Sequence, residues 1–212
     1  MTDEIRHPVF AACYDPVMWI ADRTYFAPYR RRLAACPAGV VVDLGSGTGS
    51  MLPYFAEETA RAQAFEYHAV EPDPHMRKQA RRRARAVGLP AIFHDEVAEQ
   101  LPFEASSVDI VIASLVFCTV DDPERALAEV CRVLRPGGEF RLFEHVRADR
   151  WQGRFQAMIA PVWQHVAGGC NPSRPIDRLV LDEPTLHPIE FERISIGIPP
   201  IRPFVFGRFQ RE

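Results

Sequence analysis

The sequence predicts an α/β fold: a mostly parallel sheet of seven strands with a C-terminal antiparallel hairpin and helices on both faces. Short apolar runs bounded by turn residues alternate with amphipathic stretches along most of the chain, which is typical of strand–helix units that wind a parallel sheet. The first run, residues 40–44, is apolar on both faces and therefore fits a central strand. With 212 residues, 47% of them hydrophobic, the chain has the size of one domain, and we expect 1–212 to form it.

Five apolar runs have the length and composition of strands. They lie at residues 40–44, 67–71, 91–93, 108–113 and 139–145. Two helices between them have clear boundaries. Asp73 caps the first at its N-terminus, and Gly88 supplies a left-handed stop at its other end. The second begins at Asp121 or Asp122 and ends before a Pro-Gly-Gly turn at 135–138.

The last third of the chain is less regular. Residues 146–184 are interpreted as an insertion in which several apolar residues are spaced as on a helix. Two late apolar runs, 194–198 and 203–209, are separated by two prolines. These runs are predicted to pair as the antiparallel hairpin that supplies the sixth and seventh strands.

The composition argues against several classes of protein. The formal net charge of −3 argues against a nucleic-acid partner, because proteins that bind phosphate backbones usually carry a basic surplus. The 5 cysteines are widely spaced, and the histidines show no H-E-x-x-H pattern, so we expect neither a disulfide framework nor a metal site. We find no transmembrane segment and no signal-peptide pattern in the sequence and expect a cytoplasmic protein.

A glycine-rich loop follows the first strand and reads Asp43-Leu44-Gly45-Ser46-Gly47-Thr48-Gly49. Glycine permits positive φ and lets a ligand approach without meeting a Cβ atom, so we expect a ligand at this loop. A dinucleotide pyrophosphate and S-adenosylmethionine are the two candidates. The dinucleotide pattern G-x-G-x-x-G would require a glycine where the chain has Ser50.

The G-x-G-x-G spacing with Asp43 before it instead resembles motif I of class I methyltransferases. This resemblance implies a Rossmann-like class I methyltransferase fold, S-adenosyl-L-methionine as cofactor and S-adenosyl-L-homocysteine as product. It also implies that Asp43 holds the methionine ammonium group and that Glu71 accepts the ribose hydroxyls, although dinucleotide folds use an acid at a similar place. Residues 96–103 resemble the segment that covers the adenine, and the turn at 134–138 resembles that of ubiquinone and menaquinone methylases. The cofactor-binding residues that the resemblance implies are Tyr14, Asp43, Gly45, Ser46, Gly47, Gly49, Glu71, Pro72, Val97, Ala98, Ser114 and Leu115.

Four later strings, at 113–120, 144–146, 163–174 and 202–207, look like the methyltransferase-like protein 7 family, whose animal members are thiol S-methyltransferases. The resemblance implies a small-molecule acceptor and, as the first choice, S-methylation of a thiol. N- or O-methylation of a phospholipid, quinone or natural product remains an alternative, as does a noncatalytic sensor that binds the cofactor. The animal proteins carry an apolar N-terminal anchor, whereas residues 1–35 here are rich in charge and are interpreted as lid helices.

Acceptor sites in open α/β sheets lie beyond the carboxyl ends of the strands. This rule places the insertion at 146–184 on the acceptor side and puts Glu144 and His145 near the methyl group. His145 is the first candidate for a catalytic base and Glu144 the second. Several other residues have two possible roles. Tyr14 is a lid or a packing residue, the basic helix 75–87 is a solvated surface or a peripheral membrane contact, and Cys118 and Cys170 are interpreted as packing residues. Four apolar residues form either a pocket wall or a core stripe: Trp151, Phe155, Met158 and Trp163.

Overall fold

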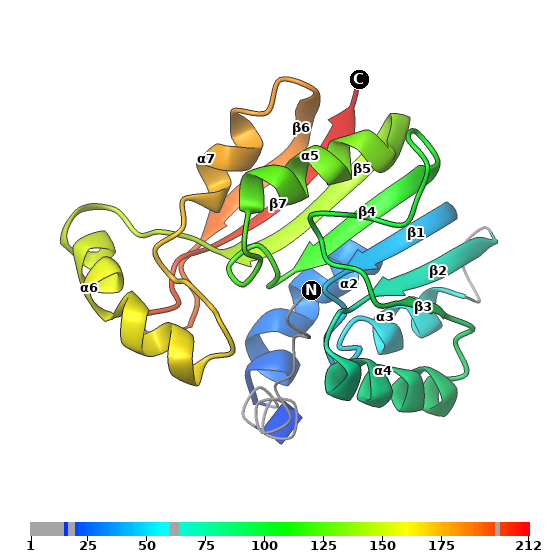
Figure 1. Ribbon diagram of the computed structural model, residues 1–212, viewed down its shortest axis with the longest axis horizontal. Coiled ribbons are helices and arrows are strands. Elements are labelled where there is room, and N and C mark those ends of the chain that lie inside the picture. Colours follow the sequence, from blue (N-terminus) through cyan, green and yellow to red (C-terminus); the bar gives the residue numbers. More distant parts are fainter. Residues whose placement is uncertain (1–14, 17–19, 60–63, 198–199) are drawn as a thin grey trace, which may run out of the picture.

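Seven strands form one mixed sheet, and their order across it is β3-β2-β1-β4-β5-β7-β6 (Figure 1). In this computed structural model, the described residues are 15–16, 20–59, 64–197 and 200–212. β7 runs antiparallel to both of its neighbours, whereas the other paired strands run parallel. The strands are β1 (Gly39–Leu44), β2 (Phe65–Val70), β3 (Ile92–His94), β4 (Val108–Ser114), β5 (Leu134–His145), β6 (Leu186–Ile194) and β7 (Phe204–Arg211). The predicted α/β fold is therefore confirmed.

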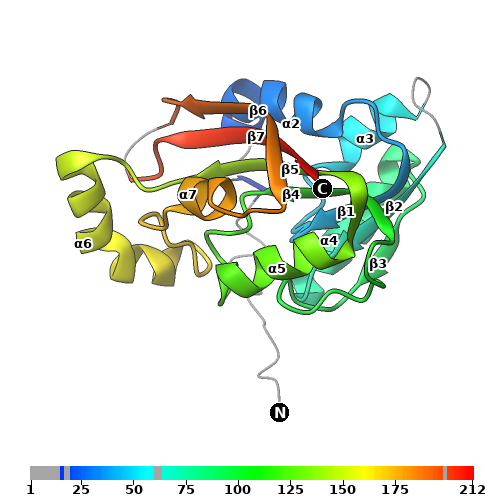
Figure 2. The same cartoon turned by 90° about the horizontal axis from the view of Figure 1, so that it is seen from above.

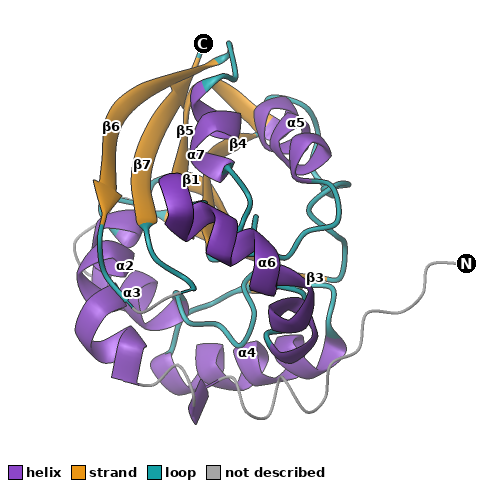
Figure 3. Ribbon diagram, turned by 90° about the vertical axis from the view of Figure 1, so that its left-hand side faces the viewer, coloured by secondary structure: helices purple, strands orange, loops and turns teal. Residues whose placement is uncertain are grey.

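Helices cover both faces of this sheet (Figure 2, Figure 3). α2, α3 and α4 pack on one face, α5 and α7 pack on the other, and α6 stands to one side of the sheet after β5 (Figure 1). The helical segments are the π-helical turn η1 (Asp22–Phe26), α2 (Ala27–Ala34), α3 (Leu52–Glu58), α4 (Pro74–Val87), α5 (Pro123–Val133), α6 (Arg150–Val166) and α7 (Ile176–Leu181). Among the described helices, none combines the length and the apolar content that a bilayer crossing requires.

Alternation along the central strands produces two apolar layers. In β1, Val42 and Leu44 pack on the face covered by α5, whereas Val41 packs on the face covered by α2, α3 and α4. All three side chains are fully buried. Each buried side chain of this size stabilises the fold by about 1.5–3 kcal/mol. The two layers explain why this strand is apolar on both faces, and they hold its carboxyl end in a fixed position.

Capping side chains set the ends of α4 and α5. Asp73 accepts hydrogen bonds of 2.7 and 3.2 Å from two backbone N–H groups in the first turn of α4, and Gly88 ends that helix with a φ of 70°. Asp122, not Asp121, caps α5 by accepting a 2.9 Å hydrogen bond from the backbone N–H of Arg125. The helix boundaries predicted from the sequence are thereby confirmed, and the choice between the two aspartates is resolved.

The edge strand differs from the prediction. The sequence places the sixth strand at 194–198, but β6 covers Leu186–Ile194 and pairs with β7 at the border of the sheet. Residues 187–189 are exposed, and Pro188 precedes a shift in the register with β7. An edge strand tolerates both features because one side of its backbone needs no partner. The polar residues that hide this strand in the sequence are therefore a consequence of its position.

Two further segments are organised differently from the prediction. The turn expected at 135–138 lies within β5. The pairing of β5 with β4 is irregular at this point, because the register shifts between Val108 and Ile110 of β4. Gly137 has a φ of 80° there, which glycine adopts without strain. The segment 146–184 contains α6, as the apolar spacing indicates, and also the short helix α7, which the sequence analysis did not predict.

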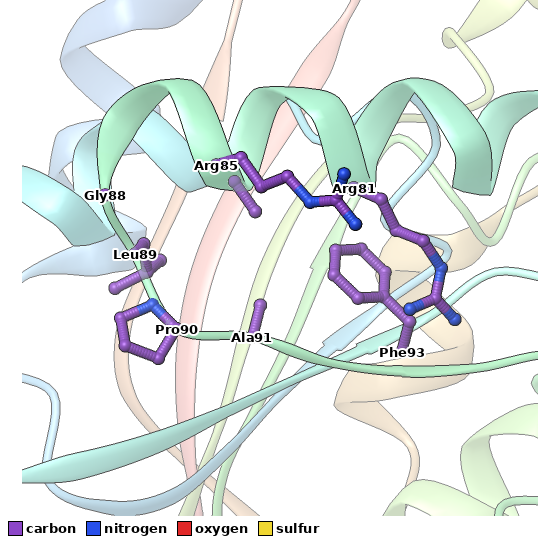
Figure 4. A pocket seen from close by; sticks show the side chains of 8 residues that line it. Arg81, Arg85, Gly88, Leu89, Pro90, Ala91 and Phe93 are labelled. Atoms are coloured by element: carbon purple, nitrogen blue, oxygen red, sulfur yellow. The ribbon is translucent and has the colours of Figure 1, made fainter.

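The basic run of α4 is divided between inward contacts and solvent. Arg77 donates to the backbone oxygen of Glu71, and Arg83 pairs with Asp15. Arg81 and the remaining basic side chains are exposed; they are Lys78, Arg82 and Arg85. The guanidinium of Arg81 lies 4.6 Å from the ring centre of Phe93, beside a shallow pocket of about 300 Å³ between α4 and β3 (Figure 4).

Candidate active site

A cavity of about 840 Å³ opens where the parallel strands end. The loop after β1, the end of β2, the loop after β4 and the last residue of β5 all contribute to its wall. Most of the predicted site residues line it; they are Gly45, Ser46, Gly47, Glu71, Pro72, Val97, Ala98, Ser114, Leu115 and His145. Asp43, Gly49 and Glu144 lie behind the wall, and Tyr14 falls outside the described residues.

The three glycines after β1 have different tasks. All three have positive φ, between 57° and 84°. A Cβ atom on Gly45 would lie 2.6 Å from a methyl carbon of Val116, and one on Gly49 would lie 2.5 Å from a methyl carbon of Leu52. A Cβ atom on Gly47 would come no closer than 3.9 Å to a neighbouring atom. The first and third glycines therefore permit close packing of protein on protein, whereas Gly47 keeps open a space at the cavity wall.

Glu71 is held beside this space by two backbone groups. Its Oε2 accepts a 2.8 Å hydrogen bond from Gly47, and its Oε1 accepts a 2.9 Å hydrogen bond from Asp73. Burial raises the pKa of Glu71 to about 7, against the opposing effect of these two hydrogen bonds. A carboxylate has about four lone-pair sites, so two remain for hydroxyl groups of a ligand. The ribose hydroxyls of the expected cofactor fit this requirement.

Asp43 ends β1 under the glycine loop. Its side chain is buried and accepts a 2.5 Å hydrogen bond from the hydroxyl of Tyr67. Burial raises the pKa of Asp43 to about 7, while the hydrogen bond from Tyr67 and the charge of Arg30 act in the opposite direction. A cationic group of a ligand nearby would favour the ionised carboxylate.

Arg30 is a cavity residue that the sequence analysis did not single out. Its side chain is 2% exposed, and it forms a 2.9 Å ion pair with Asp22. Its Nε atom has no hydrogen-bond partner within the part of the chain that the structure describes. A buried guanidinium in the cavity wall with an unused donor is suited to hold a carboxylate of a ligand. In the sequence, Arg30 belongs to a run of three arginines, and such a run is typical of a solvent-exposed surface.

The far end of the cavity contains two cysteines and a histidine. His145 Nε2 lies 3.1 Å from the sulfur of Cys170, and the indole N–H of Trp163 donates to the same sulfur at 3.3 Å. The sulfur of Cys118, the sulfur of Cys170 and the ring nitrogen of His145 all lie within 4.8 Å of one another. Packing roles were predicted for both cysteines, but both line the cavity.

Hydrogen bonds between these side chains shift their pKa values. The nearby Cys118 thiol and the hydrogen bonds of His145 and Trp163 lower the pKa of Cys170 below its usual value. The contact with Cys170 raises the pKa of Cys118 well above its usual value. Burial disfavours a charged His145, but its hydrogen bond with Cys170 and the negative charges of Cys170 and Glu144 together outweigh burial and raise the pKa of His145. The contacts within the cluster therefore favour a thiolate at Cys170, next to the ring of His145.

Glu144 supports the loop that carries Cys118. Its side chain is fully buried, and its Oε2 accepts hydrogen bonds of 2.7 Å from the backbone N–H groups of both Val116 and Phe117. Because this carboxylate points to the loop backbone, it is placed to position the cavity wall. Of the two candidates for a base, His145 is the one that lines the cavity.

The apolar residues of α6 do not form the stripe that the sequence suggests. Trp163 lines the cavity, but Trp151 and Met158 are each 70% exposed and Phe155 is 39% exposed. These three side chains therefore belong neither to the cavity wall nor to the core. The helical spacing was correct, but it does not tell which face of the helix the protein covers.

The chain matches a known family and has curated relatives over most of its length. Residues 42–142 match the methyltransferase domain family. A phosphatidylethanolamine N-methyltransferase of Cereibacter sphaeroides is 30% identical over 86% of this chain and 86% of its own length. The chain belongs to the class I S-adenosylmethionine-dependent methyltransferases. The human thiol S-methyltransferase TMT1A is 37% identical to this methyltransferase over 48% of the chain, and the match spans 43% of the human protein.

Solved structures show the same fold. A methyltransferase of Thermotoga maritima, described as a possible histamine N-methyltransferase, gives a TM-score of 0.66 at 20% identity and covers 96% of this chain and 98% of its own. The geranyl diphosphate C-methyltransferase of Streptomyces coelicolor, crystallised with S-adenosyl-L-homocysteine, gives a TM-score of 0.67 at 15% identity and covers 88% and 76%. The cofactor of this methyltransferase is S-adenosyl-L-methionine, as the glycine spacing indicated.

Proposed function

We propose that this enzyme transfers a methyl group from S-adenosylmethionine to the sulfur of a small thiol. The observation that carries the proposal is the polar cluster at the far end of the cavity, where an imidazole and an indole N–H surround a sulfur atom. A site that surrounds one sulfur with donors is suited to hold a second one nearby. The similarity to a human thiol S-methyltransferase supports the same choice of acceptor.

The near end of the cavity would hold the cofactor. Glu71 has free acceptor sites for the ribose hydroxyls, and Gly47 leaves room for the ligand beside it. Asp43 would stabilise the methionine ammonium group from behind the loop, and Arg30 would pair with the carboxylate. Val97 and Ala98 supply the apolar wall against which an adenine can lie. The cofactor supplies an electrophilic methyl group on a sulfonium.

The protein must then deliver an acceptor in line with that methyl group. Enzymes gain most from holding the reacting atoms about 3–3.5 Å apart in the correct direction. A free thiol has a pKa of about 8.5 and reacts as its thiolate, so the site must remove a proton at neutral pH. His145 is the group at the acceptor end that is placed to receive it. We infer that its replacement by alanine lowers kcat and leaves the affinity for S-adenosylhomocysteine unchanged.

The acceptor is tested with methyl-labelled S-adenosylmethionine and three substrates offered in parallel. These substrates are a set of small alkyl and aryl thiols, vesicles that contain phosphatidylethanolamine, and small primary amines. The proposal predicts label in the thiol products at a kcat/KM at least about tenfold above that for either amine. Label that enters only the phospholipid or the amines would instead support N-methylation, which the relative from Cereibacter sphaeroides represents.

A second measurement separates catalysis from binding. Calorimetry with S-adenosylhomocysteine reports whether the near end of the cavity binds the cofactor product. Binding without turnover of any acceptor would contradict the proposal and favour a sensor.

A further inference from the structure

The cluster at the acceptor end has the composition of a metal site. Cys118, His145 and Cys170 each offer one ligand atom, and these three atoms lie within 4.8 Å of one another. Thiolates and an imidazole are the ligands that zinc prefers, and a set of two cysteines and one histidine is a known catalytic combination. Three protein ligands leave the fourth tetrahedral position open.

The spacing suits an ion after a small adjustment. Zn²⁺ binds sulfur at about 2.3 Å and nitrogen at about 2.0–2.1 Å, so two ligands of a tetrahedral site lie roughly 3.5–3.8 Å apart. His145 Nε2 is 3.1 Å from the sulfur of Cys170, and no two of the three ligand atoms are more than 4.8 Å apart. Rotations of the side chains that move these atoms by about half an ångström would therefore satisfy zinc.

The backbone around the cluster is tied together without a metal. The N–H of Asn171 donates a 2.8 Å hydrogen bond to the carbonyl of Cys118, which joins the loop after α6 to the loop after β4. Arg174 reinforces this junction with hydrogen bonds of 2.7 and 2.6 Å to the carbonyls of Phe117 and Val120. His145 is fixed at the end of β5. The three ligands are therefore brought together by the fold itself, and an ion would bind to a prearranged site.

A supporting contact of the kind seen around metal ligands is also present. Trp163 Nε1–H donates to the sulfur of Cys170 at 3.3 Å. Hydrogen bonds to coordinating groups orient them and adjust the charge at the metal. The cluster also lines the cavity, so its open side faces the space where the acceptor is expected.

We propose that Cys118, His145 and Cys170 bind one Zn²⁺, and that its open position receives the sulfur of the acceptor; this second part rests on the proposed thiol methylation. When the acceptor coordinates, its S–H bond breaks and the proton leaves to solvent. A lone pair of the same sulfur then forms the bond to the methyl carbon while the bond between that carbon and the sulfonium breaks. A bound ion takes over the task of a base, because a coordinating His145 Nε2 has no free lone pair for a proton.

The site is tested first by metal content. The full-length enzyme is equilibrated with Zn²⁺, passed over a desalting column and analysed by atomic emission. We expect about one zinc per chain for the unaltered enzyme and for Cys36→Ser, a control at an exposed cysteine outside the cavity. Cys118→Ser and Cys170→Ser should lose the metal. Trp163→Phe keeps the ligands and should weaken zinc binding by about 10–100-fold, as other altered supporting contacts do.

Cobalt gives a spectroscopic reading of the ligands. Co²⁺ bound by thiolates shows a sulfur-to-metal charge-transfer band, which should appear in the unaltered enzyme and in Cys36→Ser and should be lost or weakened in Cys118→Ser and Cys170→Ser. Calorimetry with S-adenosylhomocysteine tests whether each variant is folded, since a folded variant should still bind this ligand. Less than about one tenth of a zinc per chain in the unaltered enzyme, or equal zinc in Cys170→Ser, would overturn the metal site. Thiol methylation is measured separately, so loss of the metal proposal leaves the proposed function standing on its own test.

Discussion

Asp43 and Glu71 are the residues whose chemistry depends most on their surroundings. Both are buried, and burial raises the pKa of each to about 7. Near neutral pH each carboxyl is therefore divided between its neutral and ionised forms. In the proposed complex, only the ionised form of Asp43 attracts the ammonium group fully, so the proposal links the protonation of this residue to the binding of the cofactor.

This linkage predicts a pH dependence of cofactor affinity. As pH rises from about 6 to about 8, both carboxyls ionise, and the affinity for S-adenosylhomocysteine should rise and then level off. Binding near pH 7 should release protons, because the ammonium group lowers the pKa of Asp43 in the complex. Calorimetry in two buffers with different ionisation enthalpies measures the protons released. Asp43→Asn should lower the affinity by roughly 10–100-fold, as expected for the loss of a charged hydrogen bond of about 1.5–3 kcal/mol, and should reduce the number of protons released. Glu104→Gln, at an exposed acid, is the matched control.

Glu144 allows a second prediction, about one carboxylate that supports a loop. Glu144→Ala leaves the backbone N–H groups of Val116 and Phe117 buried without their acceptor. Each unsatisfied group costs about 1–3 kcal/mol, so the free energy of unfolding should fall by roughly 2–6 kcal/mol in denaturant titrations. Glu144→Gln keeps an oxygen that can accept and should retain most of the stability and the turnover. Loss of turnover in a stable Glu144→Gln enzyme would instead make this carboxylate a base.

At the scale of elements, two glycines of the loop after β1 should affect different properties: Gly49 the stability of the fold and Gly47 the affinity for the cofactor. Gly47→Ala adds a Cβ atom in open space, whereas Gly49→Ala places one 2.5 Å from Leu52 and 3.1 Å from the backbone of Ala80. Both changes carry the cost of a positive φ, about 1–2 kcal/mol. Gly49→Ala should therefore lose clearly more stability, because α3 and α4 must move. Gly47→Ala should show the larger loss of cofactor affinity relative to its loss of stability. Thermal unfolding with and without S-adenosylhomocysteine measures both effects, and equal losses in the two variants would contradict this division.

The elements that could be predicted from the sequence are those whose signals are local. β1 is apolar on both faces, and α4 has an N-cap, a proline and a terminal glycine within its own residues. β6 could not be predicted in the same way, because its polar residues and Pro188 reflect an edge position that only the completed sheet defines. The exposed face of α6 was hidden for a related reason. Helical spacing shows that Trp151, Met158 and Trp163 belong to a helix, but not what covers each of them.

The candidate site divides in the same way. The glycine loop and Glu71 belong to one strand–helix–strand unit, so their spacing in the sequence was enough to predict that they meet at one cavity. Cys118, His145 and Cys170 come from three separate elements. Motif spacing is informative only when ligands share one element or one turn, so the sequence indicated no metal site at all. Arg30 was missed for a different reason: it belongs to a run of three arginines, which is typical of an exposed surface, whereas the fold buries its side chain.

At the scale of the whole molecule, the buried carboxyls predict how stability varies with pH. The pKa values of Asp43 and Glu71 in the folded enzyme lie above those of the unfolded chain. Their contribution to stability is therefore fully present below about pH 4 and is lost as pH rises through about 7. Each such carboxyl can account for at most roughly 4 kcal/mol, since one pKa unit corresponds to about 1.4 kcal/mol. Urea titrations at about pH 5 and pH 8 should show a smaller decline with pH in Asp43→Asn than in the unaltered enzyme. An identical decline in both would contradict the raised pKa.

The two ends of the cavity come from successive stretches of the chain, apart from the N-terminal residues such as Arg30. In the proposed function, the donor end is formed mainly by residues between 45 and 99 together with Ser114 and Leu115, and the acceptor end by residues from 116 onward. A chimera of two such enzymes joined after β4 would therefore combine a new acceptor end with an unchanged donor end. Such exchange gives natural selection a simple route to new substrates, and chimeric enzymes made at this junction offer an experimental way to follow it.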